Sequence, residues 1–182
     1  MLSKSILAGL VGLTLCVNAH TEAPIVEDNS TADFYHAQLQ IKDNSTIRGY
    51  MTAWTNSKEG MDFRVVVTGI EGHQALPYHI HEKPVPEDGN CYATGAHLDP
   101  YGRGEDPPCD IRNPATCQLG DLSGKHAPAF GPDGAEFMAE FRDFFLSNVP
   151  GNPAYFGNLS WVVHAPDKTR LNCGNFKKIV PE

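Results

Sequence analysis

The chain has 182 residues, of which 41% are hydrophobic and 20% are charged, so it is long enough to bury the core of one ordinary domain. Its 22 acidic and 14 basic residues give a net charge of −8, which excludes a surface built to attract nucleic acid. No internal repeat, low-complexity tract or linker divides the sequence. We therefore expect a single acidic domain.

Residues 1–19 have the pattern of a secretory signal peptide. Lys4 precedes an apolar run at residues 6–17, and small residues lead to a cleavage site after Ala19. The run is too short for a permanent membrane anchor, and the pattern favours a removable signal over a buried N-terminal helix. We therefore expect a secreted, extracellular domain at residues 20–182 with no stable membrane anchor. Loss of Lys4 leaves 13 basic against 22 acidic residues, a net charge near −9.

Short stretches of alternating, β-branched and aromatic residues recur along the chain, with turn clusters between them. In the first stretch, Tyr35, Ala37 and Leu39 alternate with polar residues and would share one face of a strand. No stretch shows helical periodicity. Strands at this close spacing predict an all-β antiparallel sandwich or barrel. The candidate strands lie at residues 33–42, 46–55, 61–71, 77–83, 136–147, 157–165 and 173–180.

The cysteines and the glycosylation sequons fit an oxidising, extracellular compartment. Cys16 would leave with the signal peptide, so an even set remains, which predicts two disulfides with three possible pairings. No two of these cysteines form a CxxC pair, so a thiolate zinc site is not expected. The remaining cysteines are Cys91, Cys109, Cys117 and Cys173. The sequons, which are possible sites of N-glycosylation, begin at Asn29, Asn44 and Asn158.

Four histidines are candidate metal ligands. His79 and His81 alternate on one predicted strand, so their side chains project to the same face, about 7 Å apart. Alone, such a pair could also be surface decoration. His97 lies near the start of a long loop rich in Gly, Pro, Asp and Asn, a type of segment that is usually functional. His164 ends an apolar strand, where it could be a ligand or a polar cap.

These four imidazoles come without a thiolate or a carboxylate. All-nitrogen ligation favours copper or zinc over magnesium, calcium or manganese. From the residues alone, the choice between copper and zinc stays open. The remaining histidines lack a comparable constellation, and we assign them to solvent or structural roles. They are His20, His36, His73 and His126.

Four motifs in order, "HIHEKP", "GNCYATGAHLDP", "GDLSGKHAP" and "GNLSWVVHAPDKTRLNCG", resemble the copper/zinc superoxide dismutase family. The resemblance spans most of residues 33–180 and is closest to the extracellular copper-only branch found in fungi. It implies an eight-stranded Greek-key β-barrel or sandwich of immunoglobulin-like type, with a long disulfide-tied loop. It also implies that Arg170 lies beside the copper and attracts an anionic substrate. The implied copper ligands are His79, His81, His97 and His164.

The resemblance also implies how the cysteines pair and how far the neighbouring connection covers the site. The disulfide typical of the family falls on Cys91 and Cys173, and the remaining pair, Cys109 and Cys117, would staple the long loop locally. Only "APDKT" separates the last copper histidine from Arg170. That connection is too short to cover the site, so we expect the copper to be open to solvent and substrate.

The zinc half of the copper/zinc site is incomplete. Asp121 matches a zinc-binding aspartate of the family, but Gln118 stands where the family has a histidine, and the other histidine position falls near Glu105. An amide and carboxylates replace a tetrahedral imidazole site poorly, so no zinc is expected. We expect Asp121 to orient the free ring nitrogen of His97, with Gln118 as a second polar neighbour. A turn or helix-cap role is the alternative for Asp121.

The implied function is the conversion of superoxide to oxygen and hydrogen peroxide at one copper ion per chain. The substrate is a small anion, and we expect the domain to be monomeric or weakly associated. An alternative from another class is a secreted copper-binding or scavenging protein with little or no turnover. Arg170, together with the complete set of four histidines, favours the enzyme. A zinc-only binding module would gain nothing from the arginine.

Overall fold

The structure, a computed structural model, describes residues 22–72 and 74–180. The predicted signal peptide lies outside the described residues, as do His20 and His73. The prediction of an all-β fold is confirmed, and each predicted stretch contains a strand. The strands are β1 (Phe34–Gln38), β2 (Arg48–Trp54), β3 (Met61–Thr68), β4 (Tyr78–His81), β5 (Phe137–Asp143), β6 (Ser160–His164) and β7 (Arg170–Ile179).

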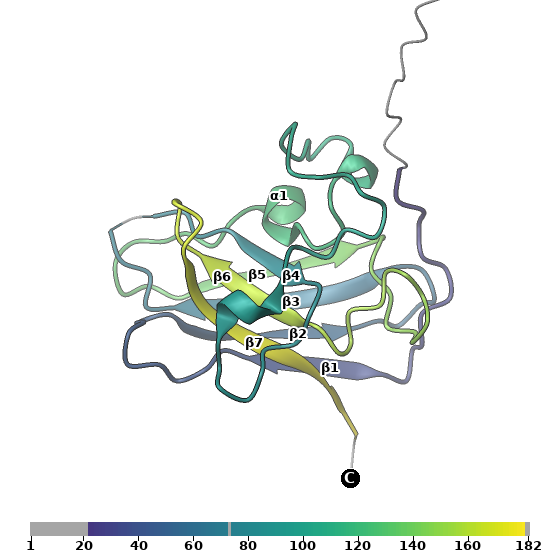
Figure 1. Ribbon diagram of the computed structural model, residues 1–182. Helices are drawn as coiled ribbons and strands as arrows, with labels where there is room; N and C mark the ends of the chain where they lie inside the picture. Colours follow the sequence, from purple (N-terminus) through teal and green to yellow (C-terminus); the bar gives the residue numbers. More distant parts are fainter. Residues whose placement is uncertain (1–21, 73, 181–182) are drawn as a thin grey trace, which may run out of the picture.

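All strand pairs are antiparallel, in the order β4-β6-β7-β1-β2-β3-β5. The ten-residue strand β7 pairs with β6 along its first part and with β1 along its second part. Because one strand belongs to both halves, the sheet curls into an incomplete barrel around its core (Figure 1). The two ends of the sheet are β4 and β5, and they are not paired with each other.

The described residues form seven strands, whereas the resemblance implied eight. Between β4 and β5 the chain forms the short helix α1 (Leu122–His126), and Ala129 in this segment makes an isolated β-bridge with Leu76, which precedes β4. The segment also contains Gly124 and Pro128, and neither residue type favours a strand. The seven stretches predicted from the residues themselves are therefore the better count.

Helix α1 fills the gap between the two sheet ends through a buried ion pair. The Nζ of Lys125 lies 2.5 Å from the Oδ2 of Asp143 on β5, and both side chains are almost fully buried. Lys125 also donates to the carbonyl oxygen of Leu119 at 2.9 Å, and His126 lies 3.0 Å from the same carboxylate. The ion pair thus fixes α1, and the residues before it, against the far edge of the sheet.

The core lies inside the curled sheet and follows the predicted alternation of side chains. Tyr35 and Ala37 on β1 are buried, while Phe34 and Gln38 face outward. Trp161 on β6 is fully buried, and it belongs to the same apolar cluster as the β1 residues. This continuous core gives the strands that carry the candidate ligands a rigid base.

The long connection from β4 to β5 contains two short 3-10 helices, η1 (Cys91–Thr94) and η2 (Pro114–Thr116), in addition to α1. Two disulfides tie it down. Cys91–Cys173 joins residues 82 positions apart and attaches η1 to β7, and Cys109–Cys117 joins residues eight positions apart within the loop. Within residues 22–72 and 74–180, no helix has the length and hydropathy needed to span a bilayer.

Candidate metal centre

The four predicted histidine ligands come together at one end of the sheet. His79 and His81 lie on β4, which pairs with β6, and His164 is the last residue of β6. His97 follows η1 and is joined to His81 by an isolated β-bridge. Each ring offers one nitrogen, and these four nitrogens all lie within 4.8 Å of one another. In the described part of the chain, no other group of three or more His, Cys, Asp or Glu residues gathers in this way.

Three of the rings are held by their Nδ1 atoms. The Nδ1 of His81 faces the carbonyl oxygen of Gly95 at 3.1 Å, and the Nδ1 of His164 faces that of Lys168 at 3.2 Å. The Nδ1 of His97 lies 2.7 Å from the Oε1 of Gln118. Because all three partners are oxygen acceptors, each Nδ1 carries the proton and each Nε2 keeps a lone pair.

His79 has the opposite orientation. Its Nε2 lies 3.4 Å from the Oδ1 of Asp121 and 3.4 Å from the Oγ of Ser123, while its Nδ1 is buried without a hydrogen-bond partner. A buried polar atom without a partner calls for an explanation such as a missing ion. The Nε2 atoms of His81 and His164 also lie only 3.2 Å apart, so two lone pairs face each other.

These observations fit a single transition-metal ion. With metal–nitrogen bonds of about 2 Å, ligand nitrogens around one ion lie about 3–4 Å apart, so small ring rotations suffice here. The donor set is four imidazoles, which suits copper or zinc. One atom of each ring is fixed by the protein, and the other remains available for the ion.

Burial keeps three of the rings in the neutral form that binds metals. Desolvation, with smaller effects of nearby imidazoles and of Arg170, lowers the pKa of His81 to about 2 and that of His164 to about 3. The pKa of His97 is lowered as well, first by burial and then by His79. A neutral imidazole keeps the lone pair that a metal requires, so no proton has to leave before binding.

Arg170 lies beside this cluster and is held firmly. Its guanidinium donates to the carbonyl oxygens of Cys91 and Gly95, each at 2.7 Å, and to the Oγ1 of Thr94 at 3.0 Å. It also stacks over the ring of Tyr92, 5.3 Å from the centroid. Because Cys91 is bonded to Cys173 on the same strand as Arg170, the disulfide keeps the guanidinium and its acceptors together.

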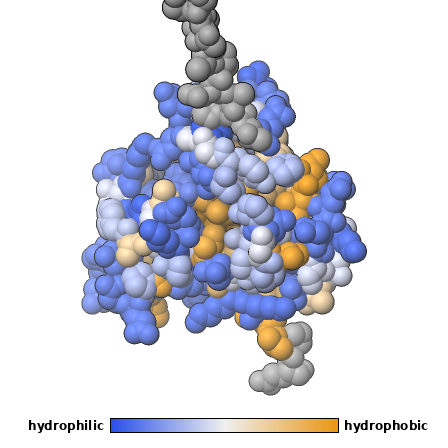
Figure 2. All heavy atoms as spheres, turned by 45° about the vertical axis from the view of Figure 1, so that its right-hand side comes forward, coloured by the Kyte–Doolittle hydropathy of each residue, from blue (hydrophilic) through white to orange (hydrophobic). Residues whose placement is uncertain are grey.

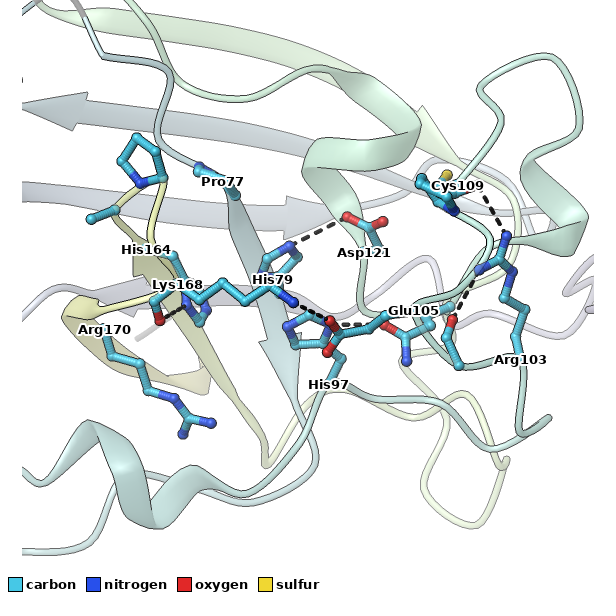
Figure 3. Close-up of a pocket in the computed structure, with 15 residues that line it drawn as sticks. Pro77, His79, His97, Arg103, Glu105, Cys109, Asp121, His164, Lys168 and Arg170 are labelled. Atoms are coloured by element: carbon cyan, nitrogen blue, oxygen red, sulfur yellow. Dashed lines mark hydrogen bonds and ion pairs between the residues drawn. The ribbon is translucent and has the colours of Figure 1, made fainter.

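A pocket of about 360 Å³ opens above the cluster. His79, His97 and His164 line it, whereas His81 is fully buried beneath it. The side chains of Lys168 and Glu105 reach across the pocket and form an ion pair of 2.9 Å (Figure 3). The hydrogen bond from Lys168 lowers the pKa of Glu105. The arrangement gives a small anion a route to the four nitrogens.

Comparison with known proteins agrees with this geometry. No family model matches the chain. A cell surface Cu-only superoxide dismutase of Arthroderma benhamiae is 35% identical, over 91% of this chain and 52% of that protein. Cell surface Cu-only superoxide dismutase 5 of Candida albicans is 33% identical, over 85% of this chain and 65% of that protein. The solved Cu(II) structure of Candida albicans superoxide dismutase 5 is 31% identical, has a TM-score of 0.72, and covers 83% of this chain and 95% of that one.

The chain belongs to the fungal Cu-only superoxide dismutase family. The resemblance recognised in the four motifs is therefore confirmed. The chain spans between half and two thirds of the length of the curated relatives it matches.

Asp121 contacts a different histidine from the one expected. The expected contact between Asp121 and His97 is wrong, because Gln118 is the hydrogen-bond partner of His97. Asp121 instead faces His79 and caps α1, accepting from the backbone nitrogen of Gly124 at 2.8 Å. Burial acts to raise the pKa of Asp121, but the contacts with His79, the backbone of Gly124 and His97 together outweigh it, and the pKa is lowered overall.

One of the three glycosylation sequons is excluded. Asn29 is only 2% exposed, and its Nδ2 donates to the carbonyl oxygens of Gly60 and Leu146. Its Oδ1 accepts from the backbone nitrogen of Asn148. A glycan on this side chain would break these contacts, so the prediction of a glycan at Asn29 is wrong. Asn44 and Asn158 are exposed and stay predicted sites.

Sequence reasoning missed several groups that hold the rings. The carbonyl oxygens of Gly95 and Lys168 fix two ligands, yet a backbone carbonyl leaves no trace in the sequence because every residue has one. Tyr92 and Asp99 were also missed, although both lie within the "CYATGAHLDP" motif that carries His97. Their position close to a candidate ligand was the available signal.

Proposed function

We propose that the chain is an extracellular superoxide dismutase that uses one copper ion and no zinc. One observation carries the proposal. Four imidazoles, each held at one nitrogen, turn the other nitrogen towards one point below an open pocket. The family, the relatives named Cu-only superoxide dismutases and the fixed guanidinium of Arg170 all support the same reading.

His79, His81, His97 and His164 would hold the copper. When bound, copper would supply one-electron redox chemistry, by which one superoxide is oxidised to oxygen and a second, with two protons, is reduced to hydrogen peroxide. The protein's own contribution is to hold the rings and to admit the substrate through the pocket.

Arg170 would attract and orient the anionic substrate. The acidic chain as a whole repels an anion, so a local cation has to offset this field near the pocket. Its hydrogen bonds to the carbonyl oxygens of Cys91 and Gly95 fix the guanidinium without cancelling its charge. Arg170 therefore combines a fixed position with a free positive charge, as substrate guidance requires.

Gln118 would keep the outer proton of His97 in place. Its Oε1 accepts from the Nδ1 of His97 at 2.7 Å, and an amide oxygen does not take up that proton at ordinary pH. The proton at Nδ1 thus stays on the ring, and Nε2 stays available for the copper.

The absence of zinc is supported by the partners of the residues that would have to bind it. Gln118 is engaged by His97 and Asp99, Asp121 by His79 and α1, and Glu105 by Lys168. The three side chains have separate partners, and the residues around them supply no further imidazole. A tetrahedral zinc site needs ligands that converge.

An extracellular location is supported by the two disulfides, the predicted signal peptide and the cell surface names of the relatives. A monomeric or weakly associated state remains a prediction.

The test is metal analysis of the secreted protein, purified without added metal and after copper loading, together with a superoxide dismutation assay. We expect about one copper per chain, negligible zinc and rapid turnover. His81→Gln is the matched variant, since it removes one ligand that does not line the pocket, and it should lose copper and turnover together. Stoichiometric zinc would contradict the proposal, and stoichiometric copper without turnover would favour the copper-binding alternative.

A further inference from the structure

We propose that Asp99 is a positioning residue of the candidate copper site, because it fixes the orientation of the Gln118 amide and thereby decides which nitrogen of His97 carries the proton. The relevance to copper rests on the proposed function. The chain of hydrogen bonds itself does not, so it can be tested in the metal-free protein.

The contacts form a short series that ends at the ligand. The Oδ2 of Asp99 accepts from the Nε2 of Gln118 at 3.2 Å, and the Oε1 of the same amide accepts from the Nδ1 of His97 at 2.7 Å. The carboxylate is itself held from the other side. Its Oδ1 accepts from the backbone nitrogen of Arg103 at 3.0 Å, and its Oδ2 accepts from that of Gly104 at 2.8 Å.

The chemistry of these groups allows only one arrangement. A carboxylate offers acceptors alone, whereas an amide has a donating end and an accepting end. The NH₂ of Gln118 must therefore face Asp99, which leaves its oxygen to face His97. An oxygen acceptor in turn requires the proton of the neutral ring to be on Nδ1, so Nε2 carries the lone pair turned towards the other imidazoles.

Arg103 makes the reference point rigid. Its side chain is almost fully buried, and its guanidinium donates to the carbonyl oxygens of Gly104 at 3.0 Å and Pro108 at 3.1 Å, as well as to those of Pro107 and Thr116. Thr116 lies just before the Cys117 that closes the short disulfide, and Gln118 follows it. These contacts fix the loop before the amide, and the backbone nitrogen of Gly120, which donates to the carbonyl oxygen of Leu98 at 2.8 Å, fixes it after the amide. Rotation of the amide plane is therefore the main freedom left for Asp99 to control.

Asp99→Leu reverses the series. Leucine is close to aspartate in shape but accepts no hydrogen bond, so the Nε2 of Gln118 and the backbone nitrogens of Arg103 and Gly104 lose their acceptor. The freed backbone donors favour the oxygen of the Gln118 amide on their side, and the amide then turns its NH₂ towards His97. His97 must accept at Nδ1, so its proton moves to Nε2, the atom that faces the other ligands. We expect the copper affinity to fall about 10–100-fold, the range typical of lost partners outside the ligand set.

The experiment is ¹⁵N NMR of histidine side chains in the metal-free, folded protein. The wild type should show His97 protonated at Nδ1, and Asp99→Leu should move this proton to Nε2 wholly or in large part. Asp110→Leu is the matched control, because Asp110 lies in the same long loop but its carboxylate contacts only Arg112. The control should leave His97 unchanged. An unchanged His97 tautomer in folded Asp99→Leu would overturn the proposal.

A double variant separates this effect from simple loop damage. Gln118→Glu in the Asp99→Leu background supplies a carboxylate, which has no donating end and therefore accepts from the Nδ1 of His97 in either orientation. It should restore the Nδ1 proton and most of the copper affinity, measured by competition with a chelator. Restoration of the fold without restoration of the tautomer would also overturn the proposal. If the tautomer responds as expected but the copper-loaded protein does not dismutate superoxide, the proposed function fails and the positioning role stands.

Discussion

The candidate site joins two regions that hold their ligands by different means. His79, His81 and His164 lie on the paired strands β4 and β6, whose positions are fixed by a ladder of backbone hydrogen bonds over a packed core. His97 lies on the long connection, where side-chain contacts, a bridge to β4 and two disulfides replace the ladder. The strands give rigidity, and the connection gives the opening and the charges that a substrate meets.

The largest expected effect comes from removing a ligand of the rigid region. His81→Gln should lower the copper affinity by more than about 100-fold, above the range for partners outside the ligand set, because no neighbour can move in to replace the buried ring. His97→Gln should lower it less, since the connection can shift and water can enter from the pocket. Copper affinities measured by chelator competition decide this. Equal losses would show that the two regions are equally rigid around the ion.

The two disulfides should differ in how much they contribute to the free energy of unfolding. Replacing Cys91 and Cys173 by serine should lower the free energy of unfolding by about 4–5 kcal/mol, because the bridge closes a loop of 82 residues. Without the bridge, residue 91 is no longer tied to β7, so its carbonyl oxygen can move away from the guanidinium of Arg170 that it now holds. Replacing Cys109 and Cys117, which are eight residues apart, should cost about 2–3 kcal/mol and leave Arg170 in place. Urea unfolding of both variants measures the difference, and a larger cost for the short bridge would contradict it.

The same contrast explains what the sequence could predict. His79 and His81 were recognisable because strand residues alternate, and the residue pattern located all seven strands. The eighth strand implied by resemblance has no counterpart among the described residues. In the connection, the order of the residues did not reveal which carboxylate meets which ring. Asp121 faces His79 rather than His97 because α1 carries it there, and that placement depends on the ion pair with β5.

A smaller effect is expected from Arg170, the cation beside the site at the start of β7. Arg170→Gln should lower the second-order rate of dismutation about 10-fold or more at low salt, the lower end of what electrostatic guidance provides, and leave the copper content unchanged. The wild-type rate should fall as ionic strength rises, and the variant should respond less. Arg112→Gln is the control, because that exposed arginine pairs with Asp110 and does not line the pocket. A parallel loss of copper and rate in Arg170→Gln would mean that the arginine holds the site together instead of guiding the substrate.

The smallest effect concerns the ion pair across the pocket. The side chains of Lys168 and Glu105 are 82% and 57% exposed, so solvent screens their attraction and it contributes little to stability. The ion pair matters more for the charge that an incoming anion meets, since Glu105 neutralises the positive charge of Lys168 at the mouth of the pocket. Glu105→Gln should therefore raise the dismutation rate about twofold at low salt, with no change near 1 M salt, where the Debye length falls to about 3 Å. Copper content should stay constant, because His164 is held by the backbone of Lys168 and not by its side chain.

The matched control for Glu105→Gln is Glu140→Gln, which removes the partner of Arg64 on the outer face of β5 and β3. Its loss changes the net charge of the protein by the same amount, but away from the pocket, so the rate should hardly change. A similar gain in both variants would mean that the overall charge governs the approach of the substrate. A gain in Glu105→Gln alone would show that the connection tunes the rate locally, with the strand-borne ligands unchanged beneath it.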